Sequence, residues 1–200
     1  PFKGLWPPIT WINSTTIAVL PFCMLLFYYS YLYSENLNAK QILFLLMLSL
    51  IIMLIKPSYL MNFVIAYPLY VLIFIKNKGV ILKGFLLVLI IGILLFLQFI
   101  YVYYFLRDNL IQYQNVRIII SPLSAWKRIS SNVTLSGLSW FLLPLSIFIF
   151  YFKQLINKKL YMFAFLNFII GLVFFILLEE IFEHNNAVVG SVNFIWQLII

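Results

Sequence analysis

The stretch Gly84-Phe-Leu-Leu-Val-Leu-Ile-Ile-Gly-Ile-Leu-Leu-Phe-Leu-Gln-Phe-Ile100 contains no charged side chain and is typical of a membrane-spanning segment. The rest of the chain has the same character. Of its 200 residues, 65% are hydrophobic and 9% are charged, and the mean hydropathy is +1.09. Soluble domains average roughly 25% charged residues. The composition therefore predicts an integral membrane protein.

The apolar runs are continuous and do not alternate with polar residues, which favours helices over barrel strands. We expect an all-α fold, a polytopic transmembrane helix bundle that forms a single domain over residues 1–200. It would have about six full spans and the start of a seventh. The expected spans are residues 15–33, 41–55, 58–75, 80–106, 135–152 and 160–178, and the seventh starts near Val192.

Both ends of the chain resemble cut ends. The chain begins with Pro1, and it stops inside the apolar run 192–200, which is shorter than the roughly 20 residues that cross a bilayer. We therefore expect the sequence to be a fragment of a longer protein. Cys23 is the one cysteine, and its apolar surroundings indicate a small buried hydrophobic residue, with a reactive thiol as the weaker alternative.

An acidic cluster follows the sixth expected span. It holds three of the five carboxylates and the one histidine, as Glu179, Glu180, Glu183 and His184. If the helix continues, residues four apart share a face, so the cluster forms a glutamate pair and a glutamate–histidine pair. A carboxylate beside an imidazole can act as a general base, bind a divalent cation or receive a proton. The simpler alternative, which the sequence alone favours slightly, is a helix that leaves the membrane with a polar cap.

Residues 107–134 form the long interruption between the fourth and fifth expected spans. They mix cations and amides with the run Ile118-Ile119-Ile120, a combination typical of elements that lie in the headgroup plane. We interpret the segment as an interfacial loop-and-helix element, and an ordinary connector is the alternative.

The distribution of lysine and arginine between the loops predicts the orientation of the chain. If the spans alternate in direction, one side carries seven cations against six on the other, and four of those six belong to the segment 107–134. The seven are Lys40, Lys76, Lys78, Lys83, Lys153, Lys158 and Lys159. We assign their side to the cytoplasm. The acidic cluster and the segment 107–134 then share the outer face.

Several site types are excluded by the absence of their motifs. The chain has no Gly-rich phosphate loop, nucleophile elbow or dinucleotide fingerprint, and its one histidine and one distant cysteine cannot form a usual structural zinc site. Soluble enzyme classes are therefore excluded. The net charge of +8 resides mainly in lysines beside spans, so we expect membrane lipids and no nucleic acid as partners.

Lys56 lies in the short turn Lys56-Pro57-Ser58 between two expected spans. Its ammonium group can anchor the turn at the interface, which is the usual role. The alternative is that it holds a phosphate of a lipid-linked substrate. The cations of the segment 107–134 are parallel candidates, namely Arg107, Arg117, Lys127 and Arg128.

Three stretches together resemble a family of bacterial polytopic membrane proteins. They are residues 7–16 leading to Pro21-Phe22, then Lys56-Pro57-Ser58, and then His184 followed by Asn193-Phe194-Ile195-Trp196-Gln197. This family is similar to proteins of surface-polysaccharide assembly, including glycosyltransferases of the C-type membrane fold and O-antigen-polymerase-like proteins. The chain departs from the family pattern at Ile12 and Ser14, where the pattern has histidine and proline.

The resemblance implies a multi-pass protein of the bacterial plasma membrane that transfers a sugar from a polyprenyl-phosphate-linked donor on the outer face. A carboxylate there would deprotonate the acceptor hydroxyl or hold a divalent cation, the one cofactor that the sequence suggests. The expected catalytic residues are Glu179, Glu180, Glu183 and His184. The expected substrate-binding residues are Lys56, Arg117, Lys127, Arg128, Asn193 and Trp196.

The competing class is a membrane transporter or lipid flippase, in which the acidic cluster would bind protons or a cation. A non-catalytic membrane scaffold is a third class. The sequence leaves the choice among them open, together with the oligomeric state.

Overall fold

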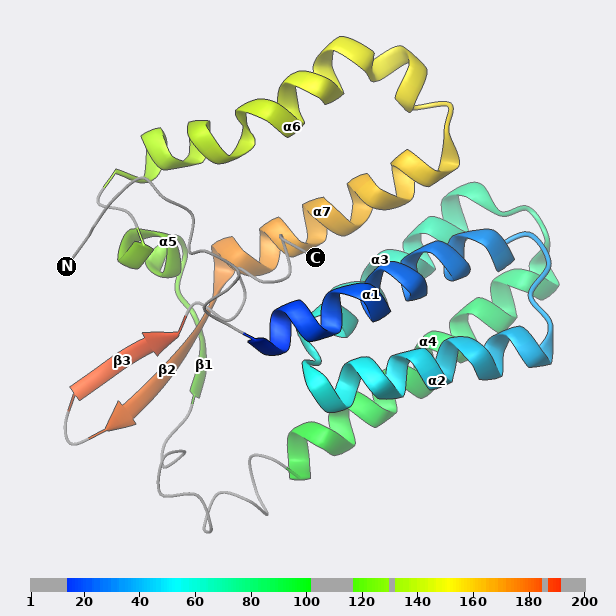
Figure 1. The fold of residues 1–200 in the computed structure, drawn as a ribbon, viewed down its shortest axis with the longest axis horizontal. Helices are drawn as coiled ribbons and strands as arrows, with labels where there is room; N and C mark the ends of the chain where they lie inside the picture. The colour runs from blue at the N-terminus through cyan, green and yellow to red at the C-terminus, as the bar shows by residue number, and fades with distance from the viewer. Residues whose placement is uncertain (1–13, 102–116, 130–131, 185–186, 192–200) are drawn as a thin grey trace.

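The computed structural model describes residues 14–101, 117–129, 132–184 and 187–191. Within these ranges the chain is mainly helical, and a small sheet lies at one end of the long helices (Figure 1). The helices are α1 (Ser14–Tyr33), α2 (Ala39–Ile55), α3 (Ser58–Phe74), α4 (Lys78–Ile100), α5 (Ser124–Ile129), α6 (Val133–Leu155) and α7 (Lys159–Leu177). The strands are β1 (Arg117–Ile120), β2 (Leu178–His184) and β3 (Ala187–Ser191).

Asparagine caps set the starts of three helices. Asn38 accepts a hydrogen bond from the Gln41 N–H at 2.9 Å, and the Gln41 side chain accepts one from the Asn38 N–H at 2.8 Å. This reciprocal capping box begins α2. Asn77 and Asn132 cap α4 and α6 in the simpler way, each accepting from a backbone N–H of the first turn at 2.9 Å. The long helices therefore begin close to the starts expected from the apolar runs.

Three helical segments among the described residues are long and apolar enough to cross a membrane: Ile17–Glu35, Lys78–Ile100 and Lys159–Leu177. The helices α2 and α3 are apolar but have 17 residues each. At 1.5 Å per residue they extend about 26 Å, which is slightly less than the roughly 30 Å hydrocarbon core. The prediction of membrane-spanning helices is supported, but the number of about six full spans is not. The seventh, near Val192, lies outside the described residues.

One phenylalanine joins the C-terminal helix α7 to the N-terminal helices. The ring of Phe163 stacks on Phe27 of α1 at a centroid distance of 4.7 Å and lies 4.6 Å from the ring of Tyr70 of α3. Tyr67 and Phe63 of α3 stack on each other at 5.1 Å and also contact Phe163. Of these rings, all but the half-buried Phe27 are fully buried. The helices α1, α3 and α7 therefore share one core.

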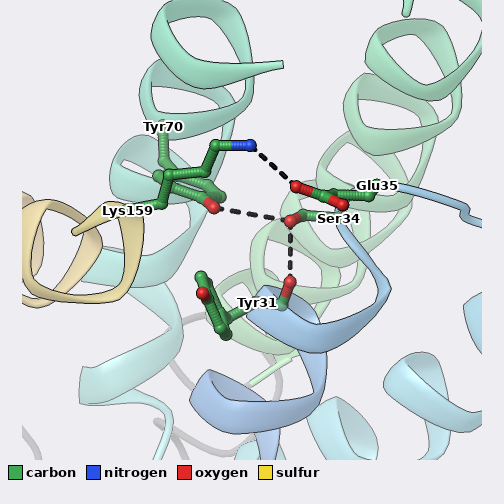
Figure 2. Close-up of polar contacts among 5 residues, drawn as sticks. All are labelled: Tyr31, Ser34, Glu35, Tyr70 and Lys159. Atoms are coloured by element: carbon green, nitrogen blue, oxygen red, sulfur yellow. Dashed lines mark hydrogen bonds and ion pairs between the residues drawn. The ribbon is translucent and has the colours of Figure 1, made fainter. Parts of the chain in front are cut away.

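The connections α1–α2, α3–α4 and α6–α7, with lysines in or beside them, lie at one end of the bundle, which Figure 2 shows in close-up, and the sheet lies at the other end (Figure 1). Two contacts hold these connections together. The Lys159 ammonium pairs with the Glu35 carboxylate at 2.7 Å, and the Lys83 ammonium donates to the backbone oxygen of Leu37 at 2.9 Å. The predicted grouping of these lysines at one end, called the lysine end below, is confirmed. Its assignment to the cytoplasm remains a prediction.

The helix does not continue through the acidic cluster, so the condition for the helical pairs is not met. The helix α7 ends at Leu177, and the chain turns directly into strand β2. The order of the sheet is β1-β2-β3, and both pairs are antiparallel. Branched and aromatic residues such as Ile119 and Val189 are abundant in these segments and favour strands. Pairing on both edges of β2 satisfies its backbone groups without a helix.

Candidate functional site at the sheet end

The sheet joins two parts of the sequence that carry the predicted site residues. In the register of β1 and β2, Ile119 lies opposite Glu179, and Arg117 lies opposite Ile181. Positions 179 and 183 are then the diagonal neighbours of position 117, and diagonal positions of an antiparallel pair lie roughly 7–8 Å apart. The backbone therefore places a predicted phosphate-binding arginine beside two positions of the acidic cluster.

The strand also changes the pairing within the acidic cluster. In a helix, residues four apart are neighbours on one face, but in a strand they are separated by roughly 13 Å. The predicted helical pairs, Glu179 with Glu183 and Glu180 with His184, are therefore not formed as neighbours. Successive strand positions alternate between the two faces of the sheet. Position 179 shares its face with positions 117 and 119, and position 180 belongs to the other face.

The turn between β1 and α5 is anchored to the end of α7. The backbone N–H of Ser121 donates to Leu177 O at 2.9 Å, and that of Leu123 donates to Ile176 O at 2.8 Å. These bonds fix β1 and the start of α5 against the last turn of α7. The expected interfacial element 107–134 thus contains a strand and a short helix in its described part.

Trp126 holds α5 in place and was not singled out from the sequence. Its indole N–H donates to the Ser136 hydroxyl at 2.7 Å, and its ring lies 5.3 Å from the ring of Phe175. A Cβ atom at Gly137 would come within 3.2 Å of the indole, so the glycine lets α6 approach closely. The sequence feature that could have identified Trp126 is a tryptophan directly before two cations, Lys127 and Arg128. Lys127, which follows it, is exposed as a substrate-binding cation would need to be.

Lys56 lies at the same end of the bundle as the sheet, because the α2–α3 turn is opposite the α1–α2 connection. Its backbone N–H donates to Ile52 O at 2.7 Å and ends α2. The side chain is half-buried, and this burial lowers the pKa of the Lys56 ammonium below its ordinary value. A phosphate group beside it would favour the charged form again.

The remaining predicted residues are placed only in part. Arg128 belongs to α5, and Asn193 and Trp196 lie outside the described residues. Among the residues that the structure describes, no three His, Cys, Asp or Glu side chains are grouped in the way that would hold a metal ion.

A buried pair of asparagines in the bundle interior was missed in the sequence. The Asn62 amide donates to Asn167 O at 2.8 Å, and the Asn167 amide donates to Phe163 O at 2.9 Å. The first bond joins α3 to α7 in the apolar interior, and the second lies within α7. The two Oδ1 atoms are buried without a hydrogen-bond partner among the described residues. The sequence feature that could have predicted this pair is a lone asparagine within each of two apolar runs.

The buried part of the described bundle contains serine, asparagine, tyrosine and apolar side chains, but no charged one. Its charged groups, Glu35, Lys83 and Lys159 among them, lie at the ends of the helices. Chemistry that needs charge is therefore confined to the two ends, as far as the structure describes them. No protein-family model, curated protein or solved structure matches this chain.

Proposed function

We propose that this protein belongs to the assembly of cell-surface polysaccharides or glycolipids and transfers a sugar from a polyprenyl-phosphate-linked donor at its sheet end. The observation that carries the proposal is the β1–β2 register, which sets Arg117 diagonal to Glu179. A carboxylate can take the proton of the acceptor hydroxyl, and a guanidinium can hold the leaving phosphate by bidentate, charge-assisted hydrogen bonds. Lys56 supplies a second cation at the same end.

We also propose that the protein lies in a bacterial plasma membrane with its sheet end on the outer face. We further propose that α2, α3 and α6 cross the membrane together with the three longer apolar spans. This arrangement is supported by the alternation of the helix connections between the two ends (Figure 1). α6 has 23 residues, and α2 and α3 can match a slightly thinned bilayer with little tilt.

One observation favours the second candidate, a membrane transporter or lipid flippase. Asn62, Asn167, Tyr59 and Tyr67 each place an oxygen in the interior without a partner among the described residues, and polar groups at membrane depth often mark a transport path. Proton and cation pathways, however, generally use charged side chains at that depth. The described interior has none, so sugar transfer at the sheet end is the stronger proposal.

Reconstituted full-length protein distinguishes the two functions. Proteoliposomes are given a radiolabelled polyprenyl-phosphate-linked sugar together with a panel of glycan acceptors. We expect the label to move from the donor lipid to an acceptor, above the level seen with protein-free liposomes. Uptake or flipping of the labelled lipid without transfer to any acceptor would contradict the proposal and support the transporter.

A further inference from the structure

The buried face of α7 has a polar centre between two aromatic rings. Its buried residues recur at every fourth position: Phe163, Asn167, Gly171 and Phe175. Phe163 belongs to the ring cluster with α1 and α3, and the ring centroid of Phe175 lies 5.3 Å from that of Trp126. An amide and a glycine therefore occupy the middle of a helix face that carries packed rings on both sides of them.

The helix α3 presents polar side chains at the same level. Asn62 contacts α7 directly, because its amide donates to Asn167 O at 2.8 Å. Ser58 and Tyr59 precede Asn62 by four and three positions, so they share its side of α3, one turn nearer the sheet end. The helices α3 and α7 run antiparallel, so Gly171 likewise lies one turn nearer the sheet end than Asn167 (Figure 1). The polar residues of α3 are therefore level with a position of α7 that has no side chain.

Four oxygen atoms at this level are buried and have no hydrogen-bond partner among the residues that the structure describes. They are the hydroxyl oxygens of Ser58 and Tyr59 and the Oδ1 atoms of Asn62 and Asn167. Tyr59, Asn62 and Asn167 are 3%, 1% and 8% exposed. An unpaired polar group is costly in an apolar interior. Four of them at one level indicate a bound partner that the described side chains do not supply.

We propose that water molecules bind between α3 and α7 in the space beside Gly171. Water suits these groups because it both donates and accepts: it can donate to the two Oδ1 atoms and accept from the hydroxyl groups of Ser58 and Tyr59. A metal cation is disfavoured, since the buried part of the described bundle has no charged side chain to compensate it. The waters bridge α3 to α7 and add to the direct bond between Asn62 and Asn167. Their binding does not depend on sugar transfer at the sheet end.

Radiolytic footprinting of the full-length protein in nanodiscs tests this site. A short X-ray pulse converts bound water to hydroxyl radicals, which oxidise the side chains they touch, and mass spectrometry identifies the oxidised residues. We expect oxidation of Tyr59, although its side chain is buried, and none of Phe163, which is fully buried among rings. An unmodified Tyr59, or equal oxidation of the two residues, would overturn the inference.

Isotope exchange separates bound water from brief entry of bulk water. Since packed rings lie on both sides of the site, its water should exchange more slowly than water at the surface. The protein is mixed with water that contains heavy oxygen immediately before the pulse. We expect Tyr59 to gain ordinary oxygen, whereas Tyr161, which is exposed at the lysine end, gains heavy oxygen. Equal incorporation of heavy oxygen by the two tyrosines would show entry from the bulk and contradict a bound-water site.

A substitution that fills the space tests the position of the site. Gly171→Ala places a methyl group in the proposed water space and should greatly reduce the oxidation of Tyr59. Gly92→Ala on α4 is the matched control, because a Cβ atom there would meet its nearest neighbour, Val64, at an ordinary contact distance of 4.0 Å. It should leave the oxidation of Tyr59 unchanged. Unchanged oxidation in the Gly171→Ala protein, at an unchanged elution profile, would overturn a site beside this glycine.

Discussion

Glu179→Gln combined with Glu180→Gln is expected to lower the initial rate of sugar transfer at least about 100-fold, since loss of a general base costs roughly 10²- to 10⁴-fold. Glutamine keeps the size of the side chain but cannot accept the proton of the acceptor hydroxyl. The rate is measured in proteoliposomes with equal amounts of each protein. Glu35→Gln at the lysine end is the matched control and should leave the rate nearly unchanged, because the exposed Glu35–Lys159 pair contributes little to stability.

The strand register predicts different effects for the two single substitutions, because positions 179 and 180 lie on opposite faces of the sheet. Position 179 shares its face with position 117, whereas position 180 lies on the other face. Glu179→Gln alone should therefore account for most of the loss, and Glu180→Gln alone for little. A normal rate in the double variant at a normal protein level would contradict a catalytic role for these carboxylates.

Phe163→Ala is expected to destabilise the bundle by about 3–5 kcal/mol, the usual cost of truncating a buried phenylalanine. The Phe163 side chain is fully buried and contacts rings from both α1 and α3, so its removal leaves a cavity at the junction of three helices. In lipid this cost comes mainly from lost packing, because the surrounding hydrocarbon is as apolar as the core. The free energy of unfolding is measured by denaturant titration in mixed micelles, followed by circular dichroism.

Phe150→Ala provides the matched control, since the Phe150 side chain on α6 is 83% exposed. Its removal should change the free energy of unfolding by less than about 0.5 kcal/mol. Equal losses in the two variants would contradict a core centred on Phe163.

The helices could be predicted from the sequence because each depends on local features. Continuous apolar runs in a membrane protein leave few alternatives to a helix, and residues such as Asn38 and Asn77 mark where the helices begin. The grouping of the lysines at one end followed from the alternation of antiparallel helices. Three of the about six expected spans are long and apolar enough to cross a membrane among the described residues, and the expected spans at α2 and α3 form helices of 17 residues each.

The sheet could not be predicted from the sequence in the same way. A strand needs a partner, and the partner of Glu179 is Ile119, 60 positions earlier in the chain. The spacing of residues within the acidic cluster does not identify that partner, although Ile118-Ile119-Ile120 and Val188-Val189 have the branched side chains typical of strands. The Asn62–Asn167 bond likewise depends on how two helices that are distant in the sequence pack together.

The central claim is that the chain spans the membrane with the lysine end in the cytoplasm and the sheet end outside. Cysteine labelling tests it most directly, in a Cys23→Ala background that removes the one native thiol. Lys76→Cys in the α3–α4 turn and Lys127→Cys on α5 introduce single thiols at exposed positions of the two ends. Spheroplasts that contain either full-length variant are treated with a membrane-impermeant maleimide, before and after permeabilisation. We predict that the cysteine at position 127 reacts in intact spheroplasts and that the cysteine at position 76 reacts only after permeabilisation; equal labelling of both in intact spheroplasts, or the reverse pattern, would contradict the account.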